Sequence, residues 1–481
     1  MRIKKNVKKI TFLNPPLSLE GLYNELGASG SELPPLGLAI MAATTRQAGY
    51  ETKVIDAIAL KMGVRDTVDA IVKQSPDVVG ITATIMAIYQ ADEVAQMVKK
   101  RLPRAIVVIG GPHFTAVPEE TMRRFHSFDI GVLGEGEDTF VELLHKLGSN
   151  LQNVKGLYLR HNRDIKFTGK RPPIMDLDRI PFPAWDLLPN LVKYYQPAAD
   201  SLNRAPATLL ITSRGCTGQC LFCDRSVFGN LCRCHSADYV IKMIKLLQQE
   251  YGIRELFIED DNFLLFKSRL KEICKRIIEE KIDITWSCMA RVDTIDDEML
   301  LLLKKAGCWQ INFGCESGSQ KILDILNKGV TVRQVEDAIR LVRKHGIKVK
   351  GLFMLGNFGE TRETIQETLD FIKRVPLTDF HMTCFTPLPG AAAYELAHKY
   401  GTFDPDWKKA NMFNATNFVP NGLTKDEIDY YYKKAWRAFY LRPRIILYYA
   451  TKLREPALRK KLFLGGIAFL KFILKGNTNE K

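Results

Sequence analysis

The sequence predicts an α/β protein with two successive β/α domains and a helical C-terminal region. Short apolar runs rich in β-branched residues alternate with amphipathic stretches, first from about residue 9 to 150 and again from 206 to about 390. This alternation is typical of parallel sheets whose strands are joined by helices. After residue 390 the chain becomes rich in aromatic and basic residues, which sets the last segment apart.

The first series predicts a doubly wound domain over residues 1–150. Its expected strands are KITFL, TKVIDA, DVVGITA and AIVVIGG, and its helices include LGLAIMAATTRQAG and IYQADEVAQMVKKRL. Ligands of such sheets bind at the carboxyl ends of the strands. The chain places there Asn14, Pro15, Pro16, Asp56, Thr82, Thr84, Gly110, Gly111 and Pro112, and then the loop Gly134, Glu135, Gly136 and Glu137. These residues predict a cofactor crevice, and the alternative is that the glycines only connect strands to helices.

The middle of the chain predicts a linker and then a barrel. Residues 151–205 combine an expected hairpin, GLYLRHNRDIKF, with a proline-rich stretch that is typical of linkers. The second series, over 206–390, predicts a full or partial TIM-type barrel with strands ATLLITS, ELFIED, ITWSCMA, WQINFG and KVKGLFML. An active site would lie at the carboxyl ends of these strands. Residues 391–481 predict a helical C-terminal region.

The composition indicates a folded protein of enzyme size. With 481 residues the chain exceeds one ordinary core, and its 46% hydrophobic and 26% charged residues exclude extended disorder. The N-terminus lacks the apolar run of a secretory signal, and ten cysteines are few for this length. We therefore expect a cytoplasmic protein with free or metal-bound thiols. No segment reaches the roughly 18 apolar residues of a membrane span.

The strongest chemical signal is a cysteine triad directly after the first expected barrel strand. Cys216, Cys220 and Cys223 have the spacing C-x3-C-x2-C. Three thiolates on one short loop can bind three irons of a 4Fe-4S cluster and leave the fourth iron open. A structural zinc site would need four closed ligands instead. Such a zinc site is the alternative, and it would draw its ligands from Cys220 and Cys223 together with Cys232, Cys234 and His235.

With Phe222 before its last cysteine, the triad resembles the signature of the radical S-adenosylmethionine (SAM) superfamily. Four further motifs follow in the family's order, namely FIEDDNF (257–263), ARVDTID (290–296), FGCESGSQKIL (313–323) and GLFMLGNFGET (351–361). The N-terminal segments PPLGLAIMAA, GGPHFTAVPEE and GEGEDTF are similar to those of the cobalamin-binding subgroup. That subgroup includes anaerobic magnesium-protoporphyrin monomethyl ester cyclases and methyltransferases that act on unactivated carbon. The resemblance covers nearly the whole chain.

The resemblance implies the cofactors and several contacts. The three cysteines would hold the cluster, whose open iron chelates the amino and carboxylate groups of SAM, and one electron would cleave SAM to a 5′-deoxyadenosyl radical. Asp260 and Asp261 would face the SAM amine, because a carboxylate attracts an ammonium group. The alternative for either residue is a helix cap.

Three further residues are expected to contact SAM. Glu316 and Ser317 would bind the ribose hydroxyls, since a carboxylate accepts two hydrogen bonds from a diol. Arg291 would orient the SAM carboxylate, or else would only pair with Asp293.

The resemblance also implies a Rossmann-like cobalamin-binding domain at the N-terminus. Its expected contacts are Asp56, Thr82, Thr84, Gly110, Gly111, Gly134, Glu135 and Gly136. Many cobalamin domains carry D-x-H-x-x-G, in which the histidine is the lower axial ligand of cobalt. Here Ile58 stands at the position of that histidine, and His113 is the nearest alternative. A histidine that only bonds neighbouring protein groups is the competing interpretation, and a domain that had lost its cofactor would keep the same sheet.

The basic residues suggest partners less specifically. The net charge is +15, and the excess lies at Lys4, Lys5, Lys8 and Lys9 and in the last fifty residues. There, aromatic and aliphatic residues alternate with Lys and Arg at helical spacing, which is typical of a helix on a membrane surface or of a cap packed on the barrel. Peripheral membrane contact and a lipid-like substrate are therefore expectations.

The interpretation that joins these observations is a cobalamin-dependent radical SAM enzyme that modifies an unactivated carbon, by methyl transfer in the leading hypothesis. It would need a small-molecule or lipid-like substrate and a reductase, flavodoxin or ferredoxin as electron donor. An oxidative cyclase or a rearrangement enzyme without methyl transfer is the alternative. An RNA methylthiotransferase is the second alternative, but such proteins carry a cysteine trio near the N-terminus, and residues 1–215 contain no cysteine. Nucleic acid is therefore not an expected partner.

Overall fold

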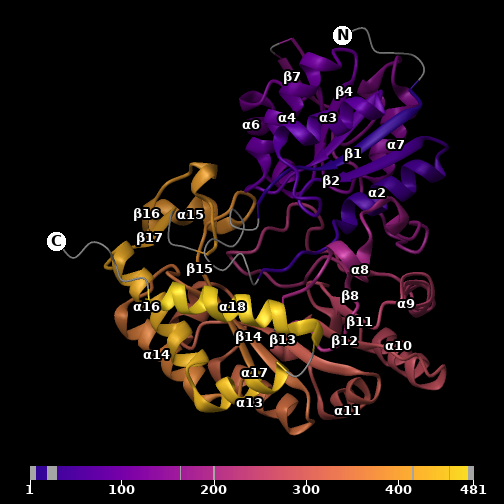
Figure 1. The fold of residues 1–481 in the computed structure, drawn as a ribbon. Coiled ribbons are helices and arrows are strands. Elements are labelled where there is room, and N and C mark those ends of the chain that lie inside the picture. The colour runs from indigo at the N-terminus through magenta and orange to yellow at the C-terminus, as the bar shows by residue number, and fades with distance from the viewer. Residues whose placement is uncertain are drawn as a thin grey trace. The chain divides into compact units, whose positions relative to one another are not determined.

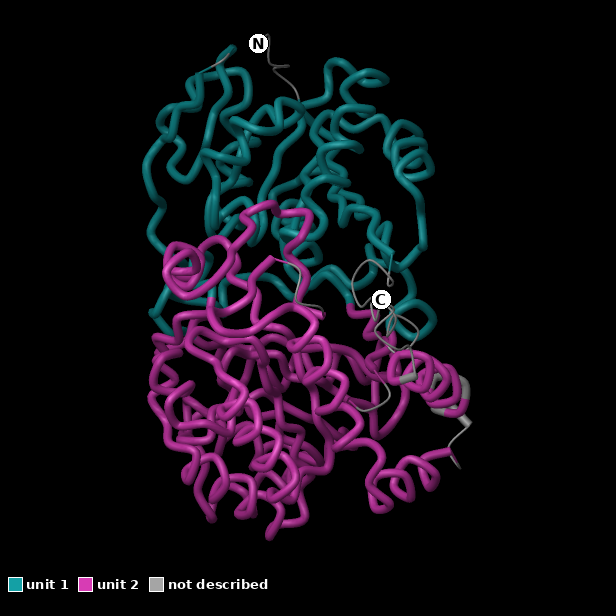
Figure 2. Tube along the Cα trace, turned by 90° about the vertical axis from the view of Figure 1, so that its left-hand side faces the viewer, with its two compact units in different colours: residues 1–18, 34–195, 224–233 teal, residues 19–33, 196–223, 234–481 magenta. Residues whose placement is uncertain are grey.

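We analysed a computed structural model, which describes residues 7–18, 30–162, 164–198, 201–413, 417–453 and 456–474. Lys4 and Lys5, two of the basic residues noted above, lie outside these ranges. The chain divides into two compact units (Figure 2). Unit 1 comprises residues 1–18, 34–195 and 224–233, and unit 2 comprises 19–33, 196–223 and 234–481. The α/β class and the order of domains expected from the sequence are confirmed.

Unit 1 is built on a sheet with the strand order β2-β1-β3-β4-β5-β6-β7 among the described residues (Figure 1). The first five of these positions in the sheet are joined by parallel pairing. The strands are β1 (Lys9–Asn14), β2 (Glu51–Asp56), β3 (Val78–Thr82), β4 (Ile106–Gly110), β5 (Ile130–Val132), β6 (Leu157–His161) and β7 (Asp164–Phe167). The order reverses at β1, so β1 and β3 flank the point where ligands of such sheets bind.

Helices cover both faces of this sheet. On one face, α2 (Leu36–Gln47) packs beside α7 (Glu137–Lys146), and on the other, α3 (Val64–Gln74) packs beside α4 (Ile88–Arg101). The shorter helices are α5 (Pro112–Ala116), α6 (Pro118–Arg124) and α8 (Leu191–Tyr194). The expected hairpin exists as β6 and β7, but it continues the sheet through antiparallel pairing of β6 with β5. Its apolar residue Leu157 completes the core, which is why it does not stand apart as a linker.

Unit 2 contains a curled parallel sheet with the order β15-β14-β13-β12-β11-β8 in the described part of the chain. The strands are β8 (Ala207–Leu210), β11 (Glu255–Ile258), β12 (Thr285–Ala290), β13 (Cys308–Glu316), β14 (Lys348–Leu355) and β15 (Asp379–Cys384). The helices between them are α9 (Ala237–Tyr251), α10 (Lys267–Glu279), α11 (Asp297–Lys305), α12 (Gln320–Ile325), α13 (Val332–Lys344) and α14 (Arg362–Arg374). Strands that neighbour in sequence also neighbour in the sheet, so the partial barrel is confirmed.

The two faces of this sheet differ in chemistry. One face carries apolar residues such as Ile258 and Trp286, and the indole of Trp286 donates to the carbonyl of Ala306 at the end of α11. Alternate residues point to the other side of a strand. That side is the concave interior, and it carries polar residues such as Glu255, whose carboxylate accepts from Thr285. A polar interior suits a barrel that holds cofactors rather than a dry core.

The C-terminal helices bridge the edge strands of the partial barrel. They are α16 (Lys425–Tyr440), α17 (Pro443–Lys452) and α18 (Pro456–Leu474), preceded by α15 (Ala392–Tyr400) and a small antiparallel pair, β16 (Gly401–Phe403) with β17 (Phe418–Pro420). α16 packs on β15 and α14. Leu462 of α18 packs on Leu202 and Ala207, beside the opposite edge. Searched over the described residues, no helix is long and apolar enough to cross a bilayer.

Substitution of Trp436 tests whether α16 packs against the barrel as part of its core. Its side chain is 7% exposed and its ring contacts Phe380 of β15 at 5.6 Å. We expect Trp436→Ala to lower the free energy of unfolding by about 3–5 kcal/mol, because it leaves a cavity between helix and sheet. Leu441→Ala, at a position 49% exposed, is the control and should have little effect. Urea titrations of anaerobically purified protein measure both, and equal small losses would contradict the packing described.

Candidate active site

The cysteine triad lies on the loop that follows β8, at the carboxyl end of the barrel strand. Cys220 is buried, whereas Cys216 and Cys223 are half-buried. The backbone N–H of Cys223 donates to the carbonyl of Cys220 at 3.2 Å, which folds the loop into a turn. Gly218 lies between two of the sulfurs, since a Cβ built there would be 3.4 Å from Cys216 Sγ and 3.8 Å from Cys220 Sγ. The missing side chain at Gly218 leaves room beside these thiols.

Two cations stand next to this loop. Burial opposes the charge of Lys328, but Glu316 and then Cys220 outweigh it and raise the pKa of Lys328. Burial likewise opposes the charge of Arg291, yet Asp293 and both Cys220 and Cys216 raise the pKa of Arg291. Cysteines bind iron as thiolates, whose negative charge these two cations would offset. The donor set, the space at Gly218 and these cations therefore fit a cluster held by cysteines.

The thiols are not closed around a common point. Over the residues that the structure describes, no group of three or more His, Cys, Asp or Glu side chains is arranged to hold a metal ion, and this includes the triad. The zinc alternative gains no support either. His235 stacks on Tyr239 with ring centroids 4.0 Å apart, and Cys232 Sγ lies 3.8 Å from the carbonyl oxygen of Asn230.

Asp260, expected near the SAM amine, is instead buried and fully engaged. Its carboxylate accepts from the N–H of Thr212 at 2.5 Å and from the hydroxyls of Thr212 and Ser213, both at 2.6 Å. Arg269 lies 3.8 Å away. Burial raises the pKa of Asp260, and these hydrogen bonds act against that rise. Asp260 therefore ties the start of the cysteine loop to the end of β11.

The neighbours of Asp260 remain available to a ligand. Asp261 is exposed as a whole residue, but partial desolvation of its carboxyl, followed by repulsion from Asp260, raises the pKa of Asp261. Glu259 continues β11, because its N–H donates to the carbonyl of Leu210, and it shares the concave side with Glu255 and Phe257. Burial raises the pKa of Glu259 to about 7. Sequence reasoning missed Glu259, although its position two residues beyond Phe257 in a strand places it on the inner face.

Glu316 forms a buried ion pair at the end of β13. Its Oε1 accepts from Lys328 Nζ at 2.6 Å, and both side chains are almost buried. The backbone of Glu316 has φ of 60°, a left-handed conformation that costs on the order of 1–3 kcal/mol in a residue with a side chain. Lys328 Nζ also lies 5.7 Å from the ring centroid of Phe222, so this pair stands next to the cysteine loop. Sequence reasoning missed Lys328.

The remaining expected SAM contacts have protein partners. Arg291 pairs with Asp293 at 2.9 Å and donates to the carbonyl of Lys328 at 3.2 Å, so the expected alternative, the Asp293 pair, is present. Ser317 is buried, with its hydroxyl 2.9 Å from Thr368 Oγ1. Phe222 of the triad signature and the expected SAM contacts Arg291 and Glu316 thus lie around Lys328.

In unit 1, the ends of β1 and β2 carry a buried polar cluster. Asp56 accepts from Asn14 Nδ2 at 2.9 Å and from the hydroxyl of Tyr195 at 2.7 Å. Burial raises the pKa of Asp56, and the hydrogen bonds from Tyr195 and Asn14 oppose that rise. Tyr195 and Asn14 therefore occupy the carboxylate that a D-x-H motif would direct to its histidine.

The ends of β3 and β4 form a close turn. Gly111 has φ of 90°, and a Cβ there would be 2.4 Å from Thr82 Oγ1, so only glycine fits. Thr82 is half-buried at the end of β3 and Thr84 is exposed in the following turn. Gly110 ends β4. This edge leaves hydroxyls and bare backbone beside the point where the strand order reverses.

Contacts with neighbouring side chains hold the loop that precedes α7. Gly134 has φ of 72°, and its N–H donates to Thr115 Oγ1 at 3.1 Å. A Cβ on Gly136 would be 3.0 Å from Met41 Sδ. Glu135 has protein partners, because its carboxylate pairs with Arg233 at 2.8 Å and accepts from the N–H of Ile174 at 2.8 Å. The Arg233 side chain and the backbone N–H of Ile174 offset the cost of burying this charge.

His113 is a structural residue of α5. Its Nε2 lies 3.2 Å from Thr121 Oγ1, and burial followed by Arg124 lowers the pKa of His113 to about 3. The ring is therefore neutral and buried. Ile58, at the position of the axial histidine, is half-buried after β2.

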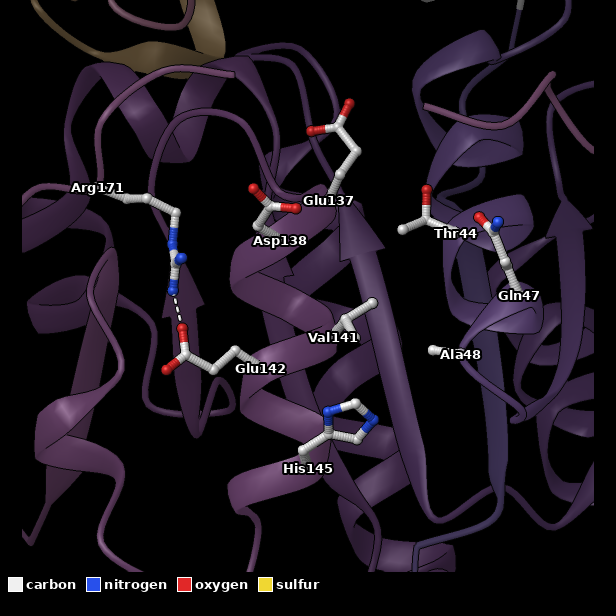
Figure 3. Close-up of a pocket in the computed structure, with 9 residues that line it drawn as sticks. All are labelled: Thr44, Gln47, Ala48, Glu137, Asp138, Val141, Glu142, His145 and Arg171. Carbon is white, nitrogen blue, oxygen red and sulfur yellow. Dashed lines mark hydrogen bonds and ion pairs between the residues drawn. The ribbon is translucent and has the colours of Figure 1, made fainter. Parts of the chain in front are cut away.

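A pocket of about 420 Å³ also opens in unit 1, between α2 and α7 (Figure 3). It is lined by Thr44, Gln47, Ala48, Glu137, Asp138, Val141, Glu142, His145 and Arg171. Arg171 pairs with Glu142, and Arg179 pairs with Asp138, so the acidic lining is partly neutralised. Of the residues that the sequence places at the cofactor crevice, Glu137 alone lines this pocket.

The five cysteines that follow Cys234 in the chain are buried. Burial raises the pKa of the thiols of Cys274, Cys315 and Cys384. Cys288 and Cys308 are also buried. These five thiols behave as small apolar groups.

The chain matches two family models in tandem. Residues 26–144 match the B12 binding domain and residues 210–372 match the radical SAM superfamily. The chain is 37% identical over 455 residues to an uncharacterized methyltransferase of Pyrococcus horikoshii, covering 92% of this chain and 94% of that protein. It is 28% identical to the anaerobic magnesium-protoporphyrin IX monomethyl ester cyclase of Rubrivivax gelatinosus, over 96% of this chain and 82% of the cyclase.

The fold is also similar to solved structures. The cobalamin-dependent S-adenosylmethionine radical enzyme OxsB aligns with a TM-score of 0.74 at 18% identity, over 97% of this chain and 72% of OxsB. The radical S-adenosylmethionine methyltransferase TsrM from Kitasatospora setae aligns with a TM-score of 0.65 at 19% identity, over 82% of this chain and 78% of TsrM. The tandem domains and the relative that spans the whole chain show that this protein belongs to the cobalamin-dependent radical SAM enzymes, which use a 4Fe-4S cluster, SAM and cobalamin.

Proposed function

We propose that this protein is a radical SAM methyltransferase that transfers a methyl group to an unactivated carbon of a small-molecule or lipid-like substrate. The observation that carries the proposal is the triad loop at the mouth of a polar barrel, joined to a doubly wound domain with an open strand edge. When bound, the cluster and SAM supply a 5′-deoxyadenosyl radical and cobalamin supplies the methyl group. The chain's own residues hold these groups and exclude water.

In unit 2, we assign Cys216, Cys220 and Cys223 to the cluster. Asp260 acts as a positioning residue, since its three hydrogen bonds to Thr212 and Ser213 fix the entry of the cysteine loop. A ligand could bind the Asp260 carboxylate only by displacing buried hydrogen bonds, which is costly.

Because Asp260 is occupied by protein hydrogen bonds, we look for the SAM contacts among the residues beside it. We assign the SAM amine to Glu259 and Asp261, because both carboxyls lie at the end of β11 and the structure shows no protein hydrogen-bond donor to Glu259 among its described residues. Glu316 and Arg291 would face the ribose and carboxylate of SAM, and Phe222 would line the site. Lys328 orients Glu316. Ser317 would support this edge through Thr368.

In unit 1, we assign cobalamin to the strand edge. Thr82, Thr84, Gly110 and Gly111 offer hydroxyls and backbone without side-chain bulk. The loop of Gly134 and Gly136 would border the same edge, with Glu135 fixing the loop through Arg233. Asp56 would act through Tyr195 and Asn14 rather than through a histidine.

A cyclase without methyl transfer is a second candidate, because the protein that resembles this chain over 96% of its length is named as a cyclase. Either reaction requires an electron from a partner, and we propose a reductase, flavodoxin or ferredoxin. The absence of cysteine from residues 1–215 argues against an RNA methylthiotransferase.

SAM with an isotopically labelled methyl group distinguishes the candidates. We expect the reduced protein with cobalamin to release 5′-deoxyadenosine and to pass the label to cobalamin, because both reactions belong to methyl transfer. Cys223→Ala should abolish deoxyadenosine formation, whereas Cys232→Ala, a half-buried thiol outside the triad, should retain it. Chromatography with mass spectrometry measures both products. Deoxyadenosine without labelled cobalamin would favour the cyclase.

Glu259 is expected to make SAM binding depend on pH. A carboxyl with a pKa of about 7 carries its charge above that pH and loses it below. The affinity for SAM should therefore weaken as the pH falls from about 8 to about 6, since the amino N–H groups of SAM lose a charged hydrogen-bond acceptor. Glu259→Gln should bind SAM weakly at both pH values, and isothermal titration with anaerobic protein measures this. An unchanged affinity in the variant would remove Glu259 from the SAM site, and Glu280→Gln on the exposed end of α10 is the control.

The cobalt of bound cobalamin should have no protein nitrogen on its lower face. Ile58 replaces the usual histidine, and His113 is buried against Thr121. We expect the electron paramagnetic resonance spectrum of cob(II)alamin in uniformly ¹⁵N-labelled protein to lack the doublet splitting that one ¹⁵N ligand produces. A triplet would report the cofactor's own ¹⁴N base. A doublet would show that a side chain of this protein binds cobalt.

A further inference from the structure

α18 is apolar on two opposite sides. One side packs on the rest of unit 2, where Phe472 contacts Tyr432 with ring centroids 5.8 Å apart and Phe469 contacts Tyr440 at 5.5 Å. In a water-soluble domain the other side of such a helix should be polar. Here it is not, so packing on the barrel does not account for the sequence of this helix.

The outward side carries large hydrophobic residues at helical spacing. Phe463, Ile467 and Leu470 recur at intervals of four and three residues, and Phe463 is 64% and Leu470 50% exposed. We define the C-terminal apolar face as the large exposed apolar residues of α18 and of α17, which α18 contacts: Ile446, Leu447, Phe463, Leu464, Ile467 and Leu470. Single exposed apolar side chains are common, but several large ones on two helices that contact each other indicate an interaction surface.

The charged residues that border this face indicate which kind of partner it binds. Residues 442–471 contain eight Lys or Arg and one acidic residue, Glu455. Among the described side chains, Arg444, Arg459 and Lys471 are exposed. Basic residues that border exposed aromatic and aliphatic ones are the pattern of helices that lie in the interface of an anionic membrane. A second copy of the chain would bring the same positive charge against itself, which opposes self-association.

We propose that α17 and α18 bind the surface of a membrane that contains anionic lipids. The C-terminal apolar face would enter the boundary between headgroups and acyl chains, while Arg444, Arg459 and Lys471 contact lipid phosphates. The other side of α18 stays on the barrel through Leu462 and Phe472. The proposal requires no spanning segment and does not depend on the reaction that the enzyme performs.

Vesicle co-sedimentation of the intact protein tests this surface. We expect binding to mixed phosphatidylcholine and phosphatidylglycerol vesicles, weak binding to phosphatidylcholine alone, and a loss of binding at high salt. Phe463→Ser combined with Leu470→Ser should lower the partition coefficient at least about tenfold, because two large apolar side chains no longer enter the lipid. Leu301→Ser, at a position 51% exposed on α11, is the matched control and should bind like the unmodified protein.

A second variant separates the charge contribution. Arg459→Glu combined with Lys471→Glu leaves the apolar face intact and should weaken binding to the anionic vesicles. Circular dichroism confirms that each variant is folded. The proposal is overturned if the unmodified protein does not sediment with anionic vesicles, or if the Phe463/Leu470 variant binds as well as the control. It is also overturned if sedimentation equilibrium without lipid shows a dimer that this variant dissociates.

Discussion

The candidate active site depends on one buried carboxylate, that of Asp260. By accepting hydrogen bonds from the N–H and hydroxyl of Thr212 and from the hydroxyl of Ser213, it joins the end of β11 to the chain that leads into the cysteine loop. A buried carboxylate needs such partners, because an unpaired one would carry a desolvation cost of several kcal/mol. The same hydrogen bonds occupy the carboxylate of Asp260. Glu259 lies on the concave side of the sheet, and Asp261 is exposed to solvent. The position of the cysteine loop and the acids that we propose for SAM therefore depend on the same hydrogen bonds.

Much of this arrangement could be predicted from the sequence. Apolar periodicity identified the strands of both sheets, and the C-x3-C-x2-C spacing identified the loop after β8. What a linear pattern could not show is which of three consecutive acids turns inward, since that depends on where Thr212 and Ser213 lie. Lys328 was missed for the same reason: twelve residues separate it from Glu316, and only the fold brings its ammonium group to that carboxylate. The sequence likewise predicts Glu135 as a cofactor contact, because it does not show that Arg233 lies beside this carboxylate.

The C-terminal helices affect how the partial barrel is enclosed. Six strands leave the sheet open in the described chain, and the α16–α18 segment covers the open side through contacts with β15 at one edge and with Leu202 and Ala207 near the other. The basic, aromatic sequence of these helices therefore serves packing first. The residues that packing does not use, on the outward side of α17 and α18, carry the separate proposal of membrane contact.

We propose that the cysteine loop holds a 4Fe-4S cluster whose open iron accepts SAM beside Glu259, Arg291 and Glu316. The most direct measurement is the electron paramagnetic resonance spectrum of the reduced protein with and without SAM, extended to nuclear double resonance with SAM labelled with ¹⁵N at its amino group. We expect SAM to change the cluster signal and the label to couple to it, since the amine would bind iron directly. A cluster signal that SAM leaves unchanged, or the absence of a cluster after anaerobic reconstitution, would contradict it.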